Sequence, residues 1–164
     1  MKNITYNRIS ACEYAKKWAL KRNPQYYNYN SLGGDCTNFI SQCIFAGSKV
    51  MNYSKQNGWY YIDGNRKSPS WTGVEFLYNF LITNKSVGPF GKISNINEIQ
   101  NGDIAQLSFD GNTYSHSLII LDINQRNLNQ IYIASHTYDS YYKPIAEYNY
   151  SKIRFVHIAN VRKW

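Results

Sequence analysis

The spacing of apolar residues changes halfway along the chain, and this change limits the folds that the sequence can adopt. Apolar residues recur at steps of three and four in three early segments, as in amphipathic helices: residues 7–23, 36–46 and 72–81. Four later runs are rich in β-branched and aromatic residues, as strands are: residues 103–109, 116–123, 130–137 and 152–161. No helical segment separates these runs, so we expect an antiparallel sheet. The sequence therefore predicts a single α+β domain over residues 1–164, with N-terminal helices packed on the sheet.

Turn and capping residues mark the expected ends of several elements. Gly47 follows the second helical segment and is a natural helix terminator. Thr72 and Glu75 have capping-box spacing at the start of the third segment. The sequence DGN at residues 110–112 lies between the first two strand runs and predicts a hairpin there.

The composition is that of a basic globular protein. Of the 164 residues, 43% are hydrophobic and 17% are charged, and the formal net charge is +8. The basic residues are scattered and no nucleic-acid-binding motif accompanies them, so nucleic acid is not an expected partner. A positive net charge also suits an anionic polymer such as a bacterial cell wall.

The sequence gives little information on localisation. No apolar run reaches the length of a membrane span, so none is predicted. The first 18 residues lack the apolar core of a signal peptide. The protein is therefore expected to be either cytoplasmic or a secreted domain whose export signal has been removed.

The cysteines do not form a recognisable disulfide or metal-binding pattern. There are three of them, an odd number, and Cys36 and Cys43 would lie about 10 Å apart along a helix, too far for a disulfide. A zinc site built from these two with His116 and His136 lacks the usual ligand spacing. No glycine-rich nucleotide-binding motif is present either, so no metal or cofactor is predicted.

The stretch LGGDCTNFISQCIFAG, residues 32–47, contains the strongest candidate for chemistry. Cys36 begins a predicted helix, where the partial positive charge of the N-terminus favours a thiolate. Unpaired N–H groups at that end can stabilise an oxyanion, and Asp35 or Thr37 can cap the first turn. On position alone, Cys36 is either a nucleophile or a buried core residue.

A cysteine nucleophile needs a base, and the chain has three histidines. His116 opens the second strand run, and His136 lies near the end of the third. If these runs form a hairpin, we expect His116 and His136 to come together across the pair. A site made of Cys36, His116 and His136 follows if the helix packs its N-terminus against that end of the sheet. His157 lies inside a strand and is interpreted as structural.

Several motifs, taken in order, resemble one protein family. They are YNRISACEYAKKWAL, GGDCTNFISQCIFAG, SWTGVEFLYNFL, NGDIAQLSF, HSLII and IASHTYD. They resemble the bacterial putative amidase domain family, which belongs with the papain-like cysteine hydrolases that include the NlpC-type and CHAP peptidoglycan hydrolases. The resemblance runs from residue 6 to the C-terminus, and GDCTNFISQ is its most specific part.

The resemblance implies a papain-like cysteine hydrolase fold, with the nucleophile at a helix N-terminus packed on an antiparallel sheet. It implies that Cys36 is the nucleophile and His116 its base. His136 falls where NlpC-type relatives place their third polar residue, and Asp139 is the alternative orienting residue. The Cys36 N–H should form part of an oxyanion hole. Further oxyanion or substrate contacts are expected from residues upstream: Tyr6, Tyr29, Asn30 and Asp35.

The leading hypothesis for function is a cysteine-dependent amidase or peptidase that hydrolyses an amide bond through a thioester. Its expected substrate is bacterial cell-wall peptidoglycan or another peptide or amide. Two alternatives remain open. One is an acyltransferase that uses the same thioester. The other is a non-hydrolytic module that binds glycan or peptide through aromatic residues: Tyr26, Tyr27, Tyr29, Trp59, Tyr60, Tyr61 and Trp71.

Overall fold

The helices precede most of the strands in the computed structural model, which describes residues 1–164. The helices are α1 (Arg8–Trp18), α2 (Cys36–Ser48), α3 (Pro69–Thr72) and α4 (Val74–Thr83). The strands are β1 (Lys2–Ile4), β2 (Gly88–Ser94), β3 (Ile104–Ser108), β4 (Tyr114–Ile123), β5 (Ile131–Ser135), β6 (Ser140–Pro144) and β7 (Lys152–Lys163), and a short 3-10 helix η1 (Ile145–Glu147) follows β6. The predicted α+β class is confirmed.

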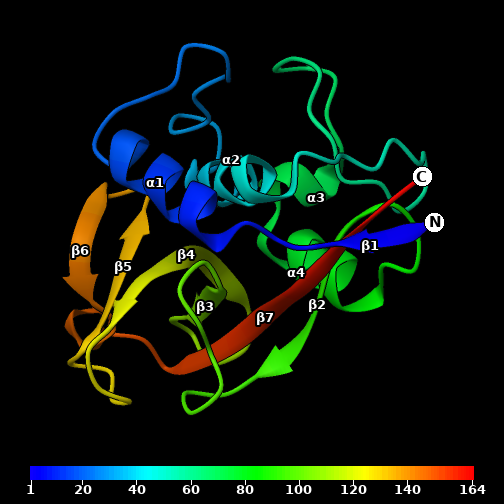
Figure 1. Cartoon of the computed structure of the whole chain (residues 1–164). Coiled ribbons are helices and arrows are strands. Elements are labelled where there is room, and N and C mark those ends of the chain that lie inside the picture. Colours follow the sequence, from blue (N-terminus) through cyan, green and yellow to red (C-terminus); the bar gives the residue numbers. More distant parts are fainter.

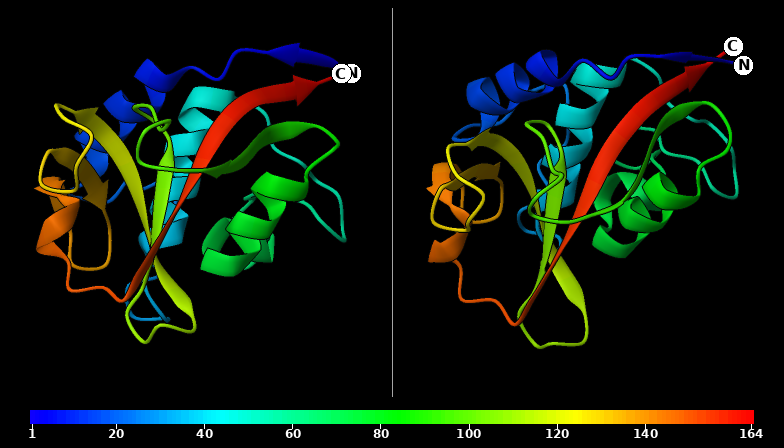
Figure 2. Two further views of the ribbon diagram at one scale, coloured as in Figure 1. Left: turned by 90° about the horizontal axis from the view of Figure 1, so that it is seen from below. Right: turned by 60° about the horizontal axis from the view of Figure 1, so that its bottom comes forward.

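The seven strands form one open antiparallel sheet. Its order is β1-β7-β3-β4-β5-β6, and β2 also pairs with β7. The expected hairpins β3–β4 and β4–β5 are both present. The long strand β7 runs diagonally across the molecule, and the two termini lie side by side because β1 pairs with its end (Figures 1 and 2).

The two faces of the sheet carry separate hydrophobic cores. On the face covered by the helices (Figure 1), Phe39 of α2 packs in one cluster with Ile119 of β4 and Ala134 of β5. On the opposite face, Leu118 belongs to a second cluster that loops and η1 complete, through residues such as Ile145. Successive residues of a strand point to opposite faces. Neighbouring residues on β4 and β5 therefore lie in different environments.

Helix α2 lies at the centre of the molecule, and every residue in it except Phe45 is buried. Two of its polar side chains pair with neighbouring segments: Gln42 Oε1 accepts a hydrogen bond from the Tyr14 hydroxyl (2.6 Å), and the Ser41 hydroxyl donates to Trp71 O (2.9 Å). A helix that is buried all round is fixed in place by contacts on every side. No helix of the structure has the length and apolar character needed to cross a membrane.

The predicted end of α2 at Gly47 is wrong. The helix continues through Ser48 and ends at Lys49, which has a left-handed φ of 56°. A Cβ on Gly47 would lie 2.5 Å from Cε2 of the buried Tyr6. Gly47 is therefore required for close packing inside the helix, not for ending it.

The predicted capping box is also wrong. Thr72 ends the four-residue helix α3, and Gly73 is the N-cap of α4, without a side-chain cap. The predicted segment 72–81 therefore begins with the last residue of α3, and Gly73, whose backbone is extended, separates it from α4. The short strands β1, β2 and β6 were not predicted, since β1 is only three residues long and β2 begins with Gly88 and Pro89.

The two tryptophans proposed as ligand-binding residues belong to the core. Trp59 and Trp71 are fully buried, with ring centroids 4.9 Å apart, in the cluster on the helical face. They are therefore unavailable for stacking on a glycan. Tyr27, from the same set of candidates, is exposed.

Candidate active site

Cys36 is the first residue of α2, and two glycines lead into it. Gly33 and Gly34 have φ values of 94° and 105°, in the region that favours glycine. A Cβ on Gly34 would lie 3.0 Å from Oγ1 of Thr137, and the same oxygen accepts a hydrogen bond from the Asp35 N–H (2.7 Å). The turn after β5 and the glycine pair thus fix the start of α2.

The Cys36 thiol lies near the part of β4 that β5 does not cover. The pairing of β4 with β5 reaches only to Ile119, and Cys36 Sγ lies beyond that point, 4.0 Å from Ser115 O and 3.8 Å from Thr37 Oγ1. The residue is 7% exposed. Burial raises the pKa of the thiol, and hydrogen bonds from the main chain of Ser117 and from Thr37 offset this only in part. Burial thus opposes the thiolate that the helix N-terminus favours.

The His116 ring is held by a serine on the neighbouring strand. Its Nε2 lies 2.9 Å from Ser135 Oγ, while its Nδ1 has no hydrogen-bond partner. The ring of Tyr148 lies beside it, with centroids 5.6 Å apart. Burial, followed by the charge of Lys143, lowers the pKa of His116 to about 4. His116 is therefore neutral near pH 7, and no hydrogen bond joins it to the Cys36 thiol.

His136 lies on the other face of the sheet. If the β4–β5 register, in which Ile119 opposes Ala134, continues, it places His136 opposite Ser117, not opposite His116. Opposed residues of an antiparallel pair point to the same face, and that face is the one covered by the helices. There the His136 ring stacks on Phe39 with centroids 4.0 Å apart. The structure thus brings His136 to α2 and does not bring it to His116.

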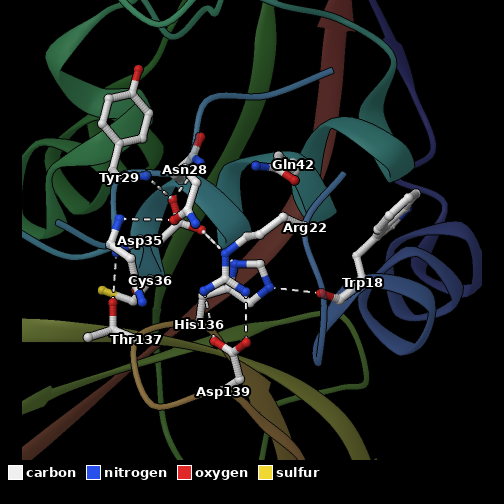
Figure 3. A network of polar contacts seen from close by, with 12 residues as sticks. Trp18, Arg22, Asn28, Tyr29, Asp35, Cys36, Gln42, His136, Thr137 and Asp139 are labelled. Carbon is white, nitrogen blue, oxygen red and sulfur yellow. Dashed lines mark hydrogen bonds and ion pairs between the residues drawn. The ribbon is translucent and has the colours of Figure 1, made fainter. Parts of the chain in front are cut away.

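A buried carboxylate, Asp35, holds His136 in this position (Figure 3). Asp35 Oδ2 lies 2.6 Å from His136 Nδ1 and 3.3 Å from Arg22 Nε. Its Oδ1 accepts hydrogen bonds from the Tyr29 N–H and from Asn38 Nδ2, both at 2.9 Å. The side chain makes no hydrogen bond to a main-chain N–H of α2. Asp35 therefore ties the loop before Cys36 to the sheet and does not act as a helix cap.

The remaining predicted residues also lie away from the His116 ring. Asp139 binds Arg22 with both carboxylate oxygens, at 2.7 and 2.9 Å (Figure 3). The Tyr29 hydroxyl donates to Gly64 O (2.7 Å), and burial raises its pKa to about 12. Asn30 is exposed on the loop before α2. None of these three side chains has a hydrogen bond to Cys36 or His116.

Two residues next to His116 were missed by the sequence reasoning. Ser135 immediately precedes His136, and strand alternation alone requires one of the two to face away from the helices. That signal was present and was not used. Tyr148 lies in the segment between η1 and β7, and no local motif connects it with His116. Only the fold brings it there.

The arrangement can support nucleophilic chemistry. A thiol and a neutral histidine lie on adjacent elements, and the His116 nitrogen that Ser135 does not hold is free to accept a proton. The Cys36 N–H has no hydrogen-bond partner, so it is available to an anionic oxygen. No group of three or more His, Cys, Asp and Glu side chains is placed so that it could hold a metal ion.

Two comparisons with known proteins found sequences similar to this chain. A family model described as "Putative amidase domain" matches residues 5–159. The uncharacterized protein YhbB of Bacillus subtilis (strain 168) is 31% identical over 138 residues, which are 82% of this chain and 42% of that protein. The chain thus spans less than half the length of this relative. No solved structure matches significantly. Since the family model covers nearly all of the sequence, the chain belongs to the Putative amidase domain family.

Proposed function

We propose that the protein is a cysteine amidase in which Cys36 is the nucleophile and His116 is its base. The observation that carries the proposal is the pairing of His116 Nε2 with Ser135, which leaves Nδ1 without a hydrogen-bond partner, while Cys36 Sγ lies 4.0 Å from the carbonyl oxygen of the preceding residue, Ser115. The family's description supports an amide substrate. In this proposal Ser135 takes the orienting role at the ring, and His136 acts through Asp35 on the position of Cys36.

The reaction proceeds by proton transfer coupled to attack. As Cys36 Sγ bonds to the amide carbon, its proton passes to His116 Nδ1 and the carbonyl π electrons move to oxygen. The carbon–nitrogen bond then breaks, His116 gives the proton to the departing amine, and a thioester remains on Cys36. Water, deprotonated by His116, then attacks the thioester carbon. The carbon–sulfur bond breaks, the carboxylic acid product leaves, and His116 returns its proton to Cys36 Sγ.

A neutral cysteine and a neutral histidine form the resting state of the proposed site. Burial raises the pKa of Cys36 and lowers that of His116 to about 4, so a preformed thiolate–imidazolium pair is disfavoured. The proposal therefore assigns His116 the role of a general base during attack. The resting thiol should react with iodoacetamide at neutral pH more slowly than a free cysteine does, because only the thiolate is nucleophilic.

The proposed substrate is a peptide or sugar–peptide amide of bacterial peptidoglycan. The net charge of +8 favours approach to an anionic wall, and the resemblance to NlpC-type and CHAP hydrolases points to the same polymer. A hollow of about 640 Å³ on the loop before Cys36, lined by Tyr27, Tyr29, Leu32 and Arg66 among others, offers room for part of such a substrate.

The test is release of soluble fragments from purified peptidoglycan sacculi, analysed by mass spectrometry. Wild type should release fragments with a newly freed amine, and Cys36→Ala should release none. His116→Ala should be slower by about 10²–10⁴-fold, the usual contribution of general acid–base catalysis. Cys12→Ala is the matched control, because Cys12 lies on α1 with its thiol against Ile120 O, and it should behave as wild type.

Two results would contradict parts of this proposal separately. If Cys36→Ala releases the same fragments as wild type, the assignment of the nucleophile is wrong. If wild type releases nothing from sacculi yet cleaves small amides in a Cys36-dependent way, the mechanism stands and the substrate assignment is wrong.

A further inference from the structure

Tyr148 carries a buried hydroxyl that has no partner at hydrogen-bond geometry, although the Ser140 and Ser135 hydroxyls lie near enough to lower its pKa. Two tyrosines on the helical side of the sheet show the usual pairing: the Tyr6 hydroxyl donates to Gly102 O (3.1 Å) and the Tyr14 hydroxyl to Gln42 Oε1 (2.6 Å). Buried polar groups are nearly always satisfied, so each exception calls for an explanation. A partner that is present only during function is one such explanation.

Tyr148 lies next to the candidate active site, where a bound substrate could be that partner. Its ring centroid lies 5.6 Å from that of His116. Burial raises the pKa of Tyr148, the Ser140 and Ser135 side chains lower it, and the charge of Cys36 raises it further. The Tyr148 ring thus lies beside the candidate base, whose other neighbour is Ser135. Two other buried hydroxyls without partners, on Ser48 and Ser94, lie at the far end of α2 and on β2.

The ring is held by a cation on β6. Lys143 Nζ lies 3.9 Å from the centroid of the Tyr148 ring, within the range of a cation–π contact. The ring thus has contacts with both Lys143 and His116, which restrict where its hydroxyl can lie. A phenol that stays protonated is a hydrogen-bond donor, which is the property that a developing anion requires.

We propose that the Tyr148 hydroxyl donates a hydrogen bond to the carbonyl oxygen of the substrate while Cys36 attacks it. The inference rests on the proposed function. When the bond from Cys36 Sγ to carbon forms, the carbonyl π electrons move to oxygen, and Tyr148 and the Cys36 N–H together stabilise the resulting oxyanion. Tyr148 keeps its proton throughout, and the thiol proton goes to His116.

The experiment compares two reactions of the same thiol. p-Nitrophenyl acetate acylates Cys36 through a tetrahedral oxyanion, whereas iodoacetamide alkylates it by displacement at a saturated carbon and forms no oxyanion. Both rates are followed by intact mass spectrometry in a Cys12→Ala background; the remaining Cys43 is fully buried, so the modification reports Cys36. The variants are Tyr148→Phe, which removes only the hydroxyl, and Tyr150→Phe as a matched control on the same loop.

Tyr148→Phe should slow acylation by about 10²-fold, as loss of an oxyanion-hole donor does, and should leave alkylation unchanged. Tyr150→Phe should change neither rate. The inference is overturned if Tyr148→Phe acylates as fast as wild type, or if it slows both reactions equally, since the hydroxyl would then act on the thiol and not on the oxyanion. If His116→Ala is acylated at the same rate as wild type, the proposed function is wrong, and the proposed role of Tyr148 is wrong with it.

Discussion

Two buried carboxylates in this protein have nearly the same partners and different surroundings. Asp35 and Asp103 are both fully buried, and each binds the Nδ1 atom of a histidine, His136 at 2.6 Å and His157 at 2.9 Å. Each also contacts an arginine. The Asp35 network lies directly before the candidate nucleophile. The Asp103 network instead joins the loop before β3 to α1 and β7, through Arg8 and the Ile158 N–H.

The two buried carboxylates have different roles in the same fold. Asp103 binds the terminal Nη1 of Arg8 directly at 2.7 Å, and Arg8 continues to Ile158 O (2.6 Å). Such a network connects distant segments of the chain. Asp35 contacts Arg22 only through Nε, at 3.3 Å without hydrogen-bond geometry. Its short contacts go to the loop and the turn on either side of Cys36, so we infer that it positions the nucleophile.

Asp35→Ala should have the largest effect. It would leave His136, Asn38 and the Tyr29 N–H without their buried acceptor, and breaking a buried pair in this way costs about 3–5 kcal/mol. Urea unfolding measures the loss. Acylation of Cys36 should also fall in the fraction that remains folded. If Asp35→Ala acylates at the wild-type rate, Asp35 does not position Cys36.

Asp103→Ala should lower the unfolding free energy somewhat less, by about 3 kcal/mol, because the Arg8 and His157 side chains keep 22% and 18% exposure. In the variant, water can reach Arg8 and His157 and replace part of the hydrogen bonding that Asp103 provided. The acylation rate of the folded protein should match wild type. A parallel loss of stability and acylation rate would contradict the division of roles between the two networks.

His116, unlike His136 and His157, has no carboxylate partner. Its effect on the unfolding free energy should therefore be visible in the pH dependence of stability. Its folded-state pKa is about 4 against 6.5 for the free side chain. The unfolded chain therefore gains a proton as the pH falls below 6.5, while the folded protein does not, and stability is lost between 6.5 and 4. Wild type should lose about 2 kcal/mol more than His116→Gln between about pH 7.5 and 5. Equal losses in both proteins would show that His116 titrates normally.

Asp139→Asn should have the smallest effect. Its contact with Arg22 lies near the surface, with the two side chains 29% and 23% exposed, and such pairs contribute about 0–1 kcal/mol. Neither the acylation rate nor its pH dependence should change. A large loss of acylation would support Asp139 as the orienting residue of His116 after all.

The order of elements was predictable from the sequence because it depends on hydrophobic period, which is a local property. The antiparallel hairpins and the position of Cys36 at the start of α2 followed from that period and from turn residues. The placement of His136 did not follow, because a shift of one residue in register moves a side chain to the other face of a sheet. Gly47 and Tyr148 depend on contacts between segments far apart in sequence, with Tyr6 and with His116.

The pH dependence of Cys36 acylation by p-nitrophenyl acetate tests the central claim most directly. If neutral His116 is the base, the rate should rise through about pH 4, stay level through neutrality, and drop sharply across that range in His116→Ala. A rate that instead follows only the thiolate, rising with pH up to the raised pKa of Cys36 and equal in wild type and His116→Ala, would contradict the account.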